Sequence, residues 1–110
     1  KNIKIKNCTI RGCAHEGIYI GPHYETRCKI VGATVENCVV ENCGWDGVQF
    51  GNTMGFDLKG CIIRNNALSK EPGQDYQVTI NPGSQGHIWR SNAIIGPIQS
   101  LESRMFLYKK

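Results

Sequence analysis

Apolar and polar side chains alternate in short runs along much of the chain. Residues 3–6 read Ile-Lys-Ile-Lys, and residues 18–20 read Ile-Tyr-Ile. A period of two predicts short β-strands with one buried and one solvated face. No stretch of 10 or more residues carries an apolar stripe at the helical period, and the runs are separated by Gly or Asn, which tolerate positive φ. The pattern therefore predicts an all-β chain of short strands and sharp bends.

Two blocks of sequence recur along the chain. The first block reads NCTIRGC in its first copy, and its copies lie at residues 7–13, 37–43, 60–66 and 91–97. The second block reads GIYIG in its first copy, and its copies lie at residues 17–21, 47–51 and 77–81. Repeats of this length are typical of solenoids, in which each repeat forms one structural unit. Two blocks in each repeat predict several strands per coil.

The segments NCTIRGCAHEGIYIG and NCVVENCGWDGVQFG resemble the parallel β-helix repeat of pectate-lyase-like proteins, polygalacturonases, alginate epimerases and phage tailspikes. The resemblance covers roughly residues 3–96 and implies a right-handed, single-stranded parallel β-helix with about three to four coils. We expect one domain over residues 1–110, with coils at roughly 3–33, 34–55, 56–86 and 87–110. The chain opens inside a predicted strand, so we also expect a missing N-terminal cap and further coils of a longer parent chain.

Aligning the repeats predicts which side chains form the core. The inward columns are expected to be Ile5, Val35, Leu58 and Trp89; Cys8, Cys38, Cys61 and Asn92; Ile10, Val40, Ile63 and Ile94; Cys13, Cys43 and Asn66; Ile18, Val48 and Val78; and Ile20, Phe50 and Ile80. The cysteines are interpreted as small core fillers, with a disulfide between coils or a zinc site as alternatives. Cys28 falls outside the columns and is the candidate reactive thiol. His87 and Trp89 are expected to close the core of the last coil.

The outward columns predict ladders of opposite charge. Glu36 falls in a column with Lys6, Lys59 and Arg90, Glu41 falls between Arg11 and Arg64, and Asp57 falls in a column with Lys4. We interpret these carboxylates as paired rather than catalytic. The formal net charge of +4 would suit an anionic polymer but is small for a nucleic-acid-binding protein. Nucleic acid is therefore not an expected partner. No apolar run is long enough to span a membrane, so a membrane is not an expected partner either.

The corner before the second block gathers most of the candidate chemistry. Its two columns are predicted to be His15, Trp45 and Asp75, and Glu16, Asp46 and Tyr76. Stacking would place Glu16 and Asp46 about 5 Å apart, close enough to raise one pKa or to share a calcium ion. That separation also suits the acid pair of a retaining glycosidase, with His15 as an alternative proton donor.

Aromatic side chains near this corner are the candidate sugar contacts, because a flat ring can pack on a sugar face. They are Trp45 and Tyr76 at the corner and Tyr19 in the second block. His23 and Tyr24, in the loop that follows the first copy of the second block, are further candidates that could line a groove. A purely structural interpretation stays open, in which Trp45 covers a seam between coils and Asp46 hydrogen-bonds the bend ahead of Gly47.

The resemblance implies a secreted, periplasmic or cell-surface protein that acts on a polysaccharide by hydrolysis, β-elimination or epimerisation. The paired aspartates and the Gly-His-Gly and Arg-Ile-Lys motifs of polygalacturonases are absent, so no residue roles carry over from that family. Apart from the possible calcium ion, no cofactor is expected. The alternative is a solenoid that binds carbohydrate or serves as a structural element without catalysis, such as an adhesin stalk or a tailspike segment.

Overall fold

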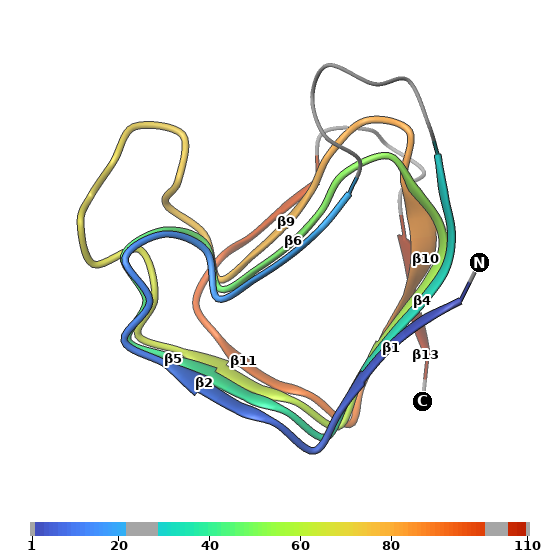
Figure 1. The fold of residues 1–110 in the computed structure, drawn as a ribbon, viewed down its shortest axis with the longest axis horizontal. Helices are drawn as coiled ribbons and strands as arrows, with labels where there is room; N and C mark the ends of the chain where they lie inside the picture. Colours follow the sequence, from blue (N-terminus) through green and yellow to red (C-terminus); the bar gives the residue numbers. More distant parts are fainter. Residues whose placement is uncertain (1, 22–28, 101–105, 110) are drawn as a thin grey trace.

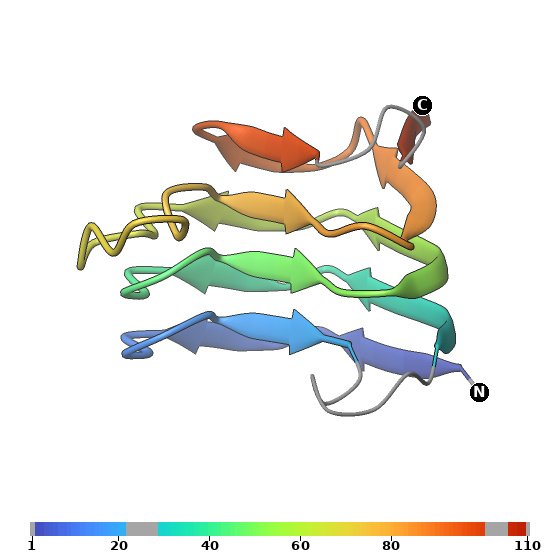
Figure 2. The ribbon, with the colours of Figure 1, turned by 90° about the horizontal axis from the view of Figure 1, so that it is seen from above.

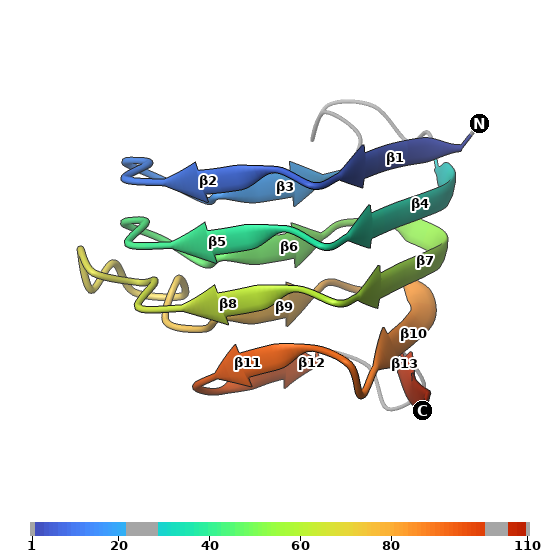
Figure 3. The same ribbon diagram turned by 90° about the horizontal axis from the view of Figure 1, so that it is seen from below.

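The protein folds into stacked coils of parallel strands, as the repeat predicts. The structure is a computed structural model that describes residues 2–21, 29–100 and 106–109. Within those ranges the chain forms thirteen strands and no helix. Looking down the stack, the coils superimpose on one another (Figure 1), and the two perpendicular views show them as successive layers (Figures 2 and 3).

Three parallel sheets form the walls of the solenoid. Sheet A contains β1 (Ile3–Lys6), β4 (Ile30–Glu36), β7 (Thr53–Lys59), β10 (Gln85–Trp89) and β13 (Phe106–Lys109). Sheet B contains β2 (Thr9–Arg11), β5 (Val39–Glu41), β8 (Ile62–Arg64) and β11 (Ala93–Ile95). Sheet C contains β3 (Ile18–Ile20), β6 (Val48–Phe50), β9 (Val78–Ile80) and β12 (Ile98–Ser100). Each of the four coils therefore contributes one strand to each wall, and β13 adds a fifth strand to sheet A.

The strand register confirms most of the predicted columns. Val40 pairs with Ile10 on one side and with Ile63 on the other, and both Val40 and Ile63 are fully buried. The core also includes two stacked rings, Phe50 and Phe56, whose centroids are 4.3 Å apart. Because most inward columns repeat one kind of side chain, apolar groups face apolar groups from coil to coil, with Asn66 and Asn92 as polar members of the two cysteine columns.

The predicted position of Trp89 in the core is wrong. Ile88 pairs with Leu58 and is buried, so the next residue, Trp89, faces outward. The register shifts by one residue between Gln85 and Gly86 because β10 has no counterpart of the positive-φ glycine that β7 carries at Gly55. The same shift gives Trp89, not Arg90, the outward position beside Lys59.

His87 also lies on the outer face of sheet A, where it pairs with Asp57, so it does not close the core as expected. The fourth coil is completed by β12, which pairs with β9 in sheet C. Strand β13 follows it and pairs with β10 in sheet A.

Asparagine and glycine form the sharp corner between sheets A and B. Asn7, Asn37 and Gly60 occupy equivalent positions there, with φ of 58°, 55° and 66°. This left-handed conformation is costly for most L-residues and is tolerated best by Gly and Asn. The corner hydrogen bonds repeat from coil to coil: the Asn7 amide donates to the Glu36 carbonyl, and the Asn37 amide donates to the Lys59 carbonyl.

The cysteine columns are buried in the second and third coils, whereas Cys8 in the first coil is exposed, contrary to prediction, and Cys13 is partly buried. Cys38, Cys43 and Cys61 are buried, and all five cysteines in the described residues are free thiols. The Cys38 and Cys61 thiols donate to the backbone carbonyls two residues earlier, at 3.3 and 3.4 Å. Burial raises the pKa of Cys61 to about 11, so this thiol stays protonated at neutral pH. The prediction of small core fillers is confirmed for these three residues, whereas Cys28 lies outside the described residues.

Neighbouring isoleucines on β8 test the assignment of the core. Replacing Ile63 by Ala removes a fully buried side chain, and we expect the free energy of unfolding to fall by about 2–5 kcal/mol. Replacing the adjacent Ile62, which is 38% exposed on the outer face, should cost less than about 1 kcal/mol. Urea denaturation followed by circular dichroism measures both values. Equal losses for the two variants would contradict the inward and outward assignment.

Candidate functional site

The predicted corner lies between sheets B and C, and its centre is a pair of stacked rings. The His15 and Trp45 rings have centroids 4.0 Å apart and an interplanar angle of 22°. The Trp45 amide also donates to the His15 carbonyl at 3.2 Å. His15 is exposed and Trp45 is half-buried. The predicted stacking of these two residues is therefore confirmed.

Asp75 does not continue this column. The Trp45 carbonyl accepts a hydrogen bond from the Ala67 amide at 2.7 Å, so the third coil meets Trp45 through Ala67. The connection between β8 and β9 is longer than its counterparts in the first two coils and extends outward (Figure 1, yellow). Asp75 is an exposed residue near the end of that connection. The extra residues displace Asp75 from the position that a constant repeat length predicts.

Asp46 is fully buried at this corner. One carboxylate oxygen accepts from the Tyr76 amide at 2.9 Å, and the other accepts from the Thr79 hydroxyl at 2.6 Å. Both donors belong to the third coil, so Asp46 joins two coils through its side chain. The predicted proximity of Asp46 and Tyr76 is confirmed. The structural role that we left open for Asp46 is also visible, although its donors lie in the next coil rather than in its own bend.

Burial raises the pKa of Asp46, because a desolvated carboxylate is less stable than the neutral acid. The hydrogen bonds from Thr79 and Tyr76 oppose this shift, and the negative charge of Asp75 adds to it. We expected the like-charged neighbour to be Glu16, but the contributing carboxylate is Asp75. Glu16 is half-buried in the first coil, and the Gly17 amide next to it donates to the Asp46 carbonyl.

These residues do not fit the calcium site that we considered at Glu16 and Asp46. Calcium takes six to eight oxygen ligands, whereas both oxygens of Asp46 already accept hydrogen bonds from the protein. Within the part of the chain that the structure describes, no three His, Cys, Asp or Glu side chains come together in a way that could hold a metal ion.

The outer face of sheet C adjoins this corner. Tyr19, Gln49 and Thr79 occupy paired positions on β3, β6 and β9. Tyr19 is 49% exposed, and its hydroxyl lies so close to Gly21 and Gly51 that a side chain at either glycine would collide with it. The predicted candidates His23 and Tyr24 lie outside the described residues. Tyr76 is half-buried beside Asp46.

Three polar residues near the corner were missed by the sequence analysis. Thr79 binds Asp46, while the side-chain carbonyl oxygens of Gln49 and Gln74 are buried without a hydrogen-bond partner. A buried acceptor without a donor is uncommon. Gln49 pairs in register with Thr79, and Gln74 lies two residues before Tyr76, so both amides adjoin the residues that donate to Asp46. Thr79 and Gln49 could have been found from the outward positions of the repeated second block. Gln74, in the long connection, had no such signal.

The predicted charge ladders are present on the outer walls. Glu41 binds Arg11 at 3.1 Å and Arg64 at 2.9 Å, and Glu36 lies 3.6 Å from Lys6. The Lys6–Glu36 pair is partly exposed and contributes less than about 1 kcal/mol, whereas Glu41 is buried between two largely exposed arginines. Asp57 is paired, as expected, although its partners are His87 and Trp89 rather than Lys4.

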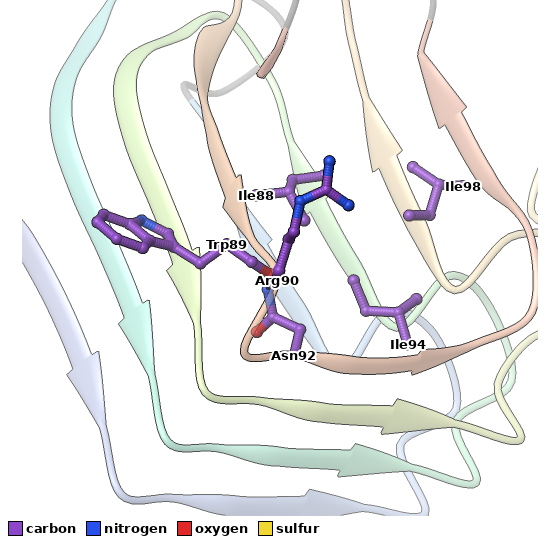
Figure 4. A pocket seen from close by; sticks show the side chains of 6 residues that line it. All are labelled: Ile88, Trp89, Arg90, Asn92, Ile94 and Ile98. Atoms are coloured by element: carbon purple, nitrogen blue, oxygen red, sulfur yellow. Dashed lines mark hydrogen bonds between the residues drawn. The ribbon is translucent and has the colours of Figure 1, made fainter. Parts of the chain in front are cut away.

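A hollow of about 230 Å³ opens in the fourth coil, and none of the predicted site residues lines it (Figure 4). Its walls include Ile88, Ile94 and Ile98, so much of its lining is apolar. Ile94 continues the inward column of Val40 and Ile63. The hollow therefore belongs to the core of the last coil and holds none of the candidate acid, base or metal-binding groups.

Three parallel walls, one strand per wall in each coil, and corners that carry the variable residues define the class of parallel β-solenoids. The family model described as "Right handed beta helix region" matches residues 1–96, and the chain belongs to this family. No curated protein and no solved structure gives a significant match to the chain. None of the described residues forms a helix that could cross a membrane.

The raised pKa of Asp46 predicts a pH dependence of stability. The unfolded chain ionises Asp46 near the ordinary value of 3.8, whereas the folded chain keeps the proton to higher pH. The contribution of Asp46 to stability is therefore complete below pH 3.8 and is lost as the pH rises through the folded-state pKa. Asp46→Asn removes this loss, and its side chain can still accept from the Tyr76 amide.

We therefore expect the free energy of unfolding of Asp46→Asn, relative to the unmodified protein, to increase with pH above 3.8. Urea denaturation at a series of pH values measures this difference, and other titrating groups cancel in it. Glu36→Gln serves as the control, because Glu36 is a partly exposed surface carboxylate paired with Lys6. A difference for Asp46→Asn that is independent of pH, or that decreases as the pH rises, would contradict the raised pKa.

Proposed function

We propose that this β-helix binds a carbohydrate polymer at the corner between sheets B and C and across the adjoining outer face of sheet C. The observation that carries the proposal is the stack of His15 on Trp45, in which His15 is exposed. Flat rings present an apolar surface with a polar edge, which suits the faces of sugar rings. The corner lies on a rigid wall, so little ordering of the protein is needed on binding.

Polar groups around the stack supply the hydrogen bonds that sugar hydroxyls need. Glu16 adjoins His15 in sequence, and Tyr19 follows on the outer face of β3 with half of its surface exposed. Gln49 lies beside Tyr19 in the next coil. These residues extend from the corner along sheet C and across coils, which suits a ligand that is longer than one sugar unit.

The location outside the cell follows from the same proposal. Extracellular polysaccharides are encountered by secreted, periplasmic or cell-surface proteins, and we propose one of these locations. Buried thiols are compatible with an oxidising compartment, because the reactive species is the thiolate and burial disfavours it. The high pKa of Cys61 supports this for one of the buried thiols.

Catalysis at this corner stays a prediction. Glu16 and Asp75 have access to solvent, whereas Asp46 has none. The raised pKa of Asp46 is a property that a general acid needs, but its carboxyl group faces Tyr76 and Thr79 of the neighbouring coil. Hydrolysis, β-elimination or epimerisation would need Asp46 to become accessible, or would rely on Glu16, Asp75 and His15 alone. Binding without turnover is the alternative.

Removing either ring of the stack tests binding. We expect His15→Ala and Trp45→Ala each to raise the dissociation constant for a matching oligosaccharide about tenfold, because each loses an aromatic contact. An oligosaccharide array identifies the ligand, and calorimetry measures the affinity. Ile95→Ala, an exposed apolar truncation on sheet B, is the control and should bind normally. Unchanged affinity in both ring variants would reject the corner as the binding site.

Turnover is tested with the ligand that the array identifies. Release of reducing ends measures hydrolysis, and absorbance of unsaturated products measures β-elimination. If the corner is catalytic, we expect Glu16→Gln or Asp46→Asn to lower the rate at least about 100-fold, the typical contribution of a general acid or base. Turnover that persists in both variants would remove these acids from the mechanism. Binding with no turnover in the unmodified protein would support the non-catalytic alternative.

A further inference from the structure

We propose that the outer face of sheet A carries a second saccharide-binding subsite, formed by Asp57, Lys59, His87 and Trp89. The subsite lies on a different wall from the corner, since sheet A runs along the opposite side of the cross-section from the long connection between β8 and β9 (Figure 1). It rests on the proposed function only in taking the same class of ligand, because no residue is shared between the two surfaces.

Strand register brings the four residues together. β7 and β10 pair in parallel, with His87 beside Asp57 and Ile88 beside Leu58. Ile88 and Leu58 face the core, so the residues that flank them face outward. Asp57 and Lys59 therefore lie on the same face as His87 and Trp89. The one-residue shift in β10 creates this arrangement, because without it Trp89 would point into the core.

Hydrogen bonding holds the indole ring in place. The Trp89 indole N–H donates to an Asp57 carboxylate oxygen at 2.8 Å, and the same oxygen lies 3.6 Å from His87 Nδ1. The Lys59 ammonium lies 5.2 Å from the centroid of the Trp89 ring, within the range of a cation–π contact. Trp89 is thus fixed by two neighbours from β7 and is pre-organised as a contact surface.

The polar side chains of this subsite still have atoms that can hydrogen-bond to a ligand. The side chains of His87 and Asp57 are 37% and 34% exposed. Both interactions of Asp57 use a single oxygen, which leaves the second carboxylate oxygen to accept from sugar hydroxyls. Among the described residues Lys59 makes no ion pair, and its ammonium carries three donors for sugar oxygens.

This combination matches the chemistry of a sugar unit. A pyranose presents apolar C–H groups on its faces and hydroxyl groups around its edge, and an ordered ring beside a carboxylate, an imidazole and an ammonium can contact both. If these residues served only to stabilise the fold, the Asp57–Trp89 hydrogen bond would be the same, so that bond alone does not distinguish the two roles. Only a binding role predicts that Lys59 and the free oxygen of Asp57 contribute to affinity for a saccharide.

Single-tryptophan variants distinguish the two surfaces, because the chain contains only Trp45 and Trp89. Trp45→Phe leaves Trp89 as the reporter of sheet A, and Trp89→Phe leaves Trp45 as the reporter of the corner. The probes are a neutral β-glucan hexasaccharide and an acidic uronate hexasaccharide, titrated while fluorescence is recorded. We expect a saturable change in Trp89 emission with at least one probe, and circular dichroism confirms that each variant is folded.

Two further substitutions in the Trp45→Phe background test the assigned contacts. Asp57→Asn can still accept from the Trp89 indole but loses the charge, and Lys59→Met keeps the apolar stem but loses the ammonium. We expect each to weaken the probe at Trp89 about tenfold. Lys4→Met is the matched control: it removes a cation from the same face of sheet A, two strands away from Asp57, and should leave affinity unchanged.

The outcomes separate the subsite from the proposed function. A response at Trp45 alone supports the corner and overturns the second subsite, and a response at Trp89 alone does the reverse. No response at either ring rejects both surfaces for these probes. Equal weakening by Lys59→Met and Lys4→Met would also overturn the subsite, because it would indicate a general effect of net charge rather than a contact with Lys59.

Discussion

The structure depends on the parallel hydrogen-bonded register between successive coils. Each strand satisfies its backbone groups through the coils above and below, so the walls have no free edge along their length. The same register decides every side-chain neighbour. Val40 lies between Ile10 and Ile63, and Glu41 lies between Arg11 and Arg64, because residues on adjacent strands follow one another in order. Core packing and surface charge pairing are thus two results of one backbone arrangement.

The corner between sheets B and C shows how the register of the coils positions polar side chains. Asp46 is buried because the third coil covers it, and that coil supplies both of its hydrogen-bond donors. Its carboxyl group therefore links the stability of the stack to the polar surface beside it. His15 and Trp45 stack because the first two coils have the same length between β2 and β3 and between β5 and β6. The proposed binding surface and a structural contact are formed here by neighbouring residues of one short segment.

Much of the architecture could be predicted from the sequence, since the repeated blocks specify both strands and corners. The columns of Cys38 and Cys61 and of Val48 and Val78 needed only the spacing of those blocks. The errors occurred where the repeat length changes within a coil. Trp89 was misplaced because β10 lacks a bulged glycine, and Asp75 was misplaced because the connection after β8 is longer. The burial of Asp46 depends on the conformation of that connection, for which no repeated pattern exists.

The bulged glycine described in β7 has a wider consequence for how such a wall can change. Adjacent residues of a strand face opposite sides, so gaining or losing one residue exchanges the two faces beyond that point. The exchange of faces ends at the corner that follows β10. Arg90 is an additional residue at this corner, so Asn92 again lies beside Cys61 in the predicted column. A compensated pair of single-residue changes can therefore bring an indole to the surface of one coil while the preceding coil keeps its own inner and outer residues.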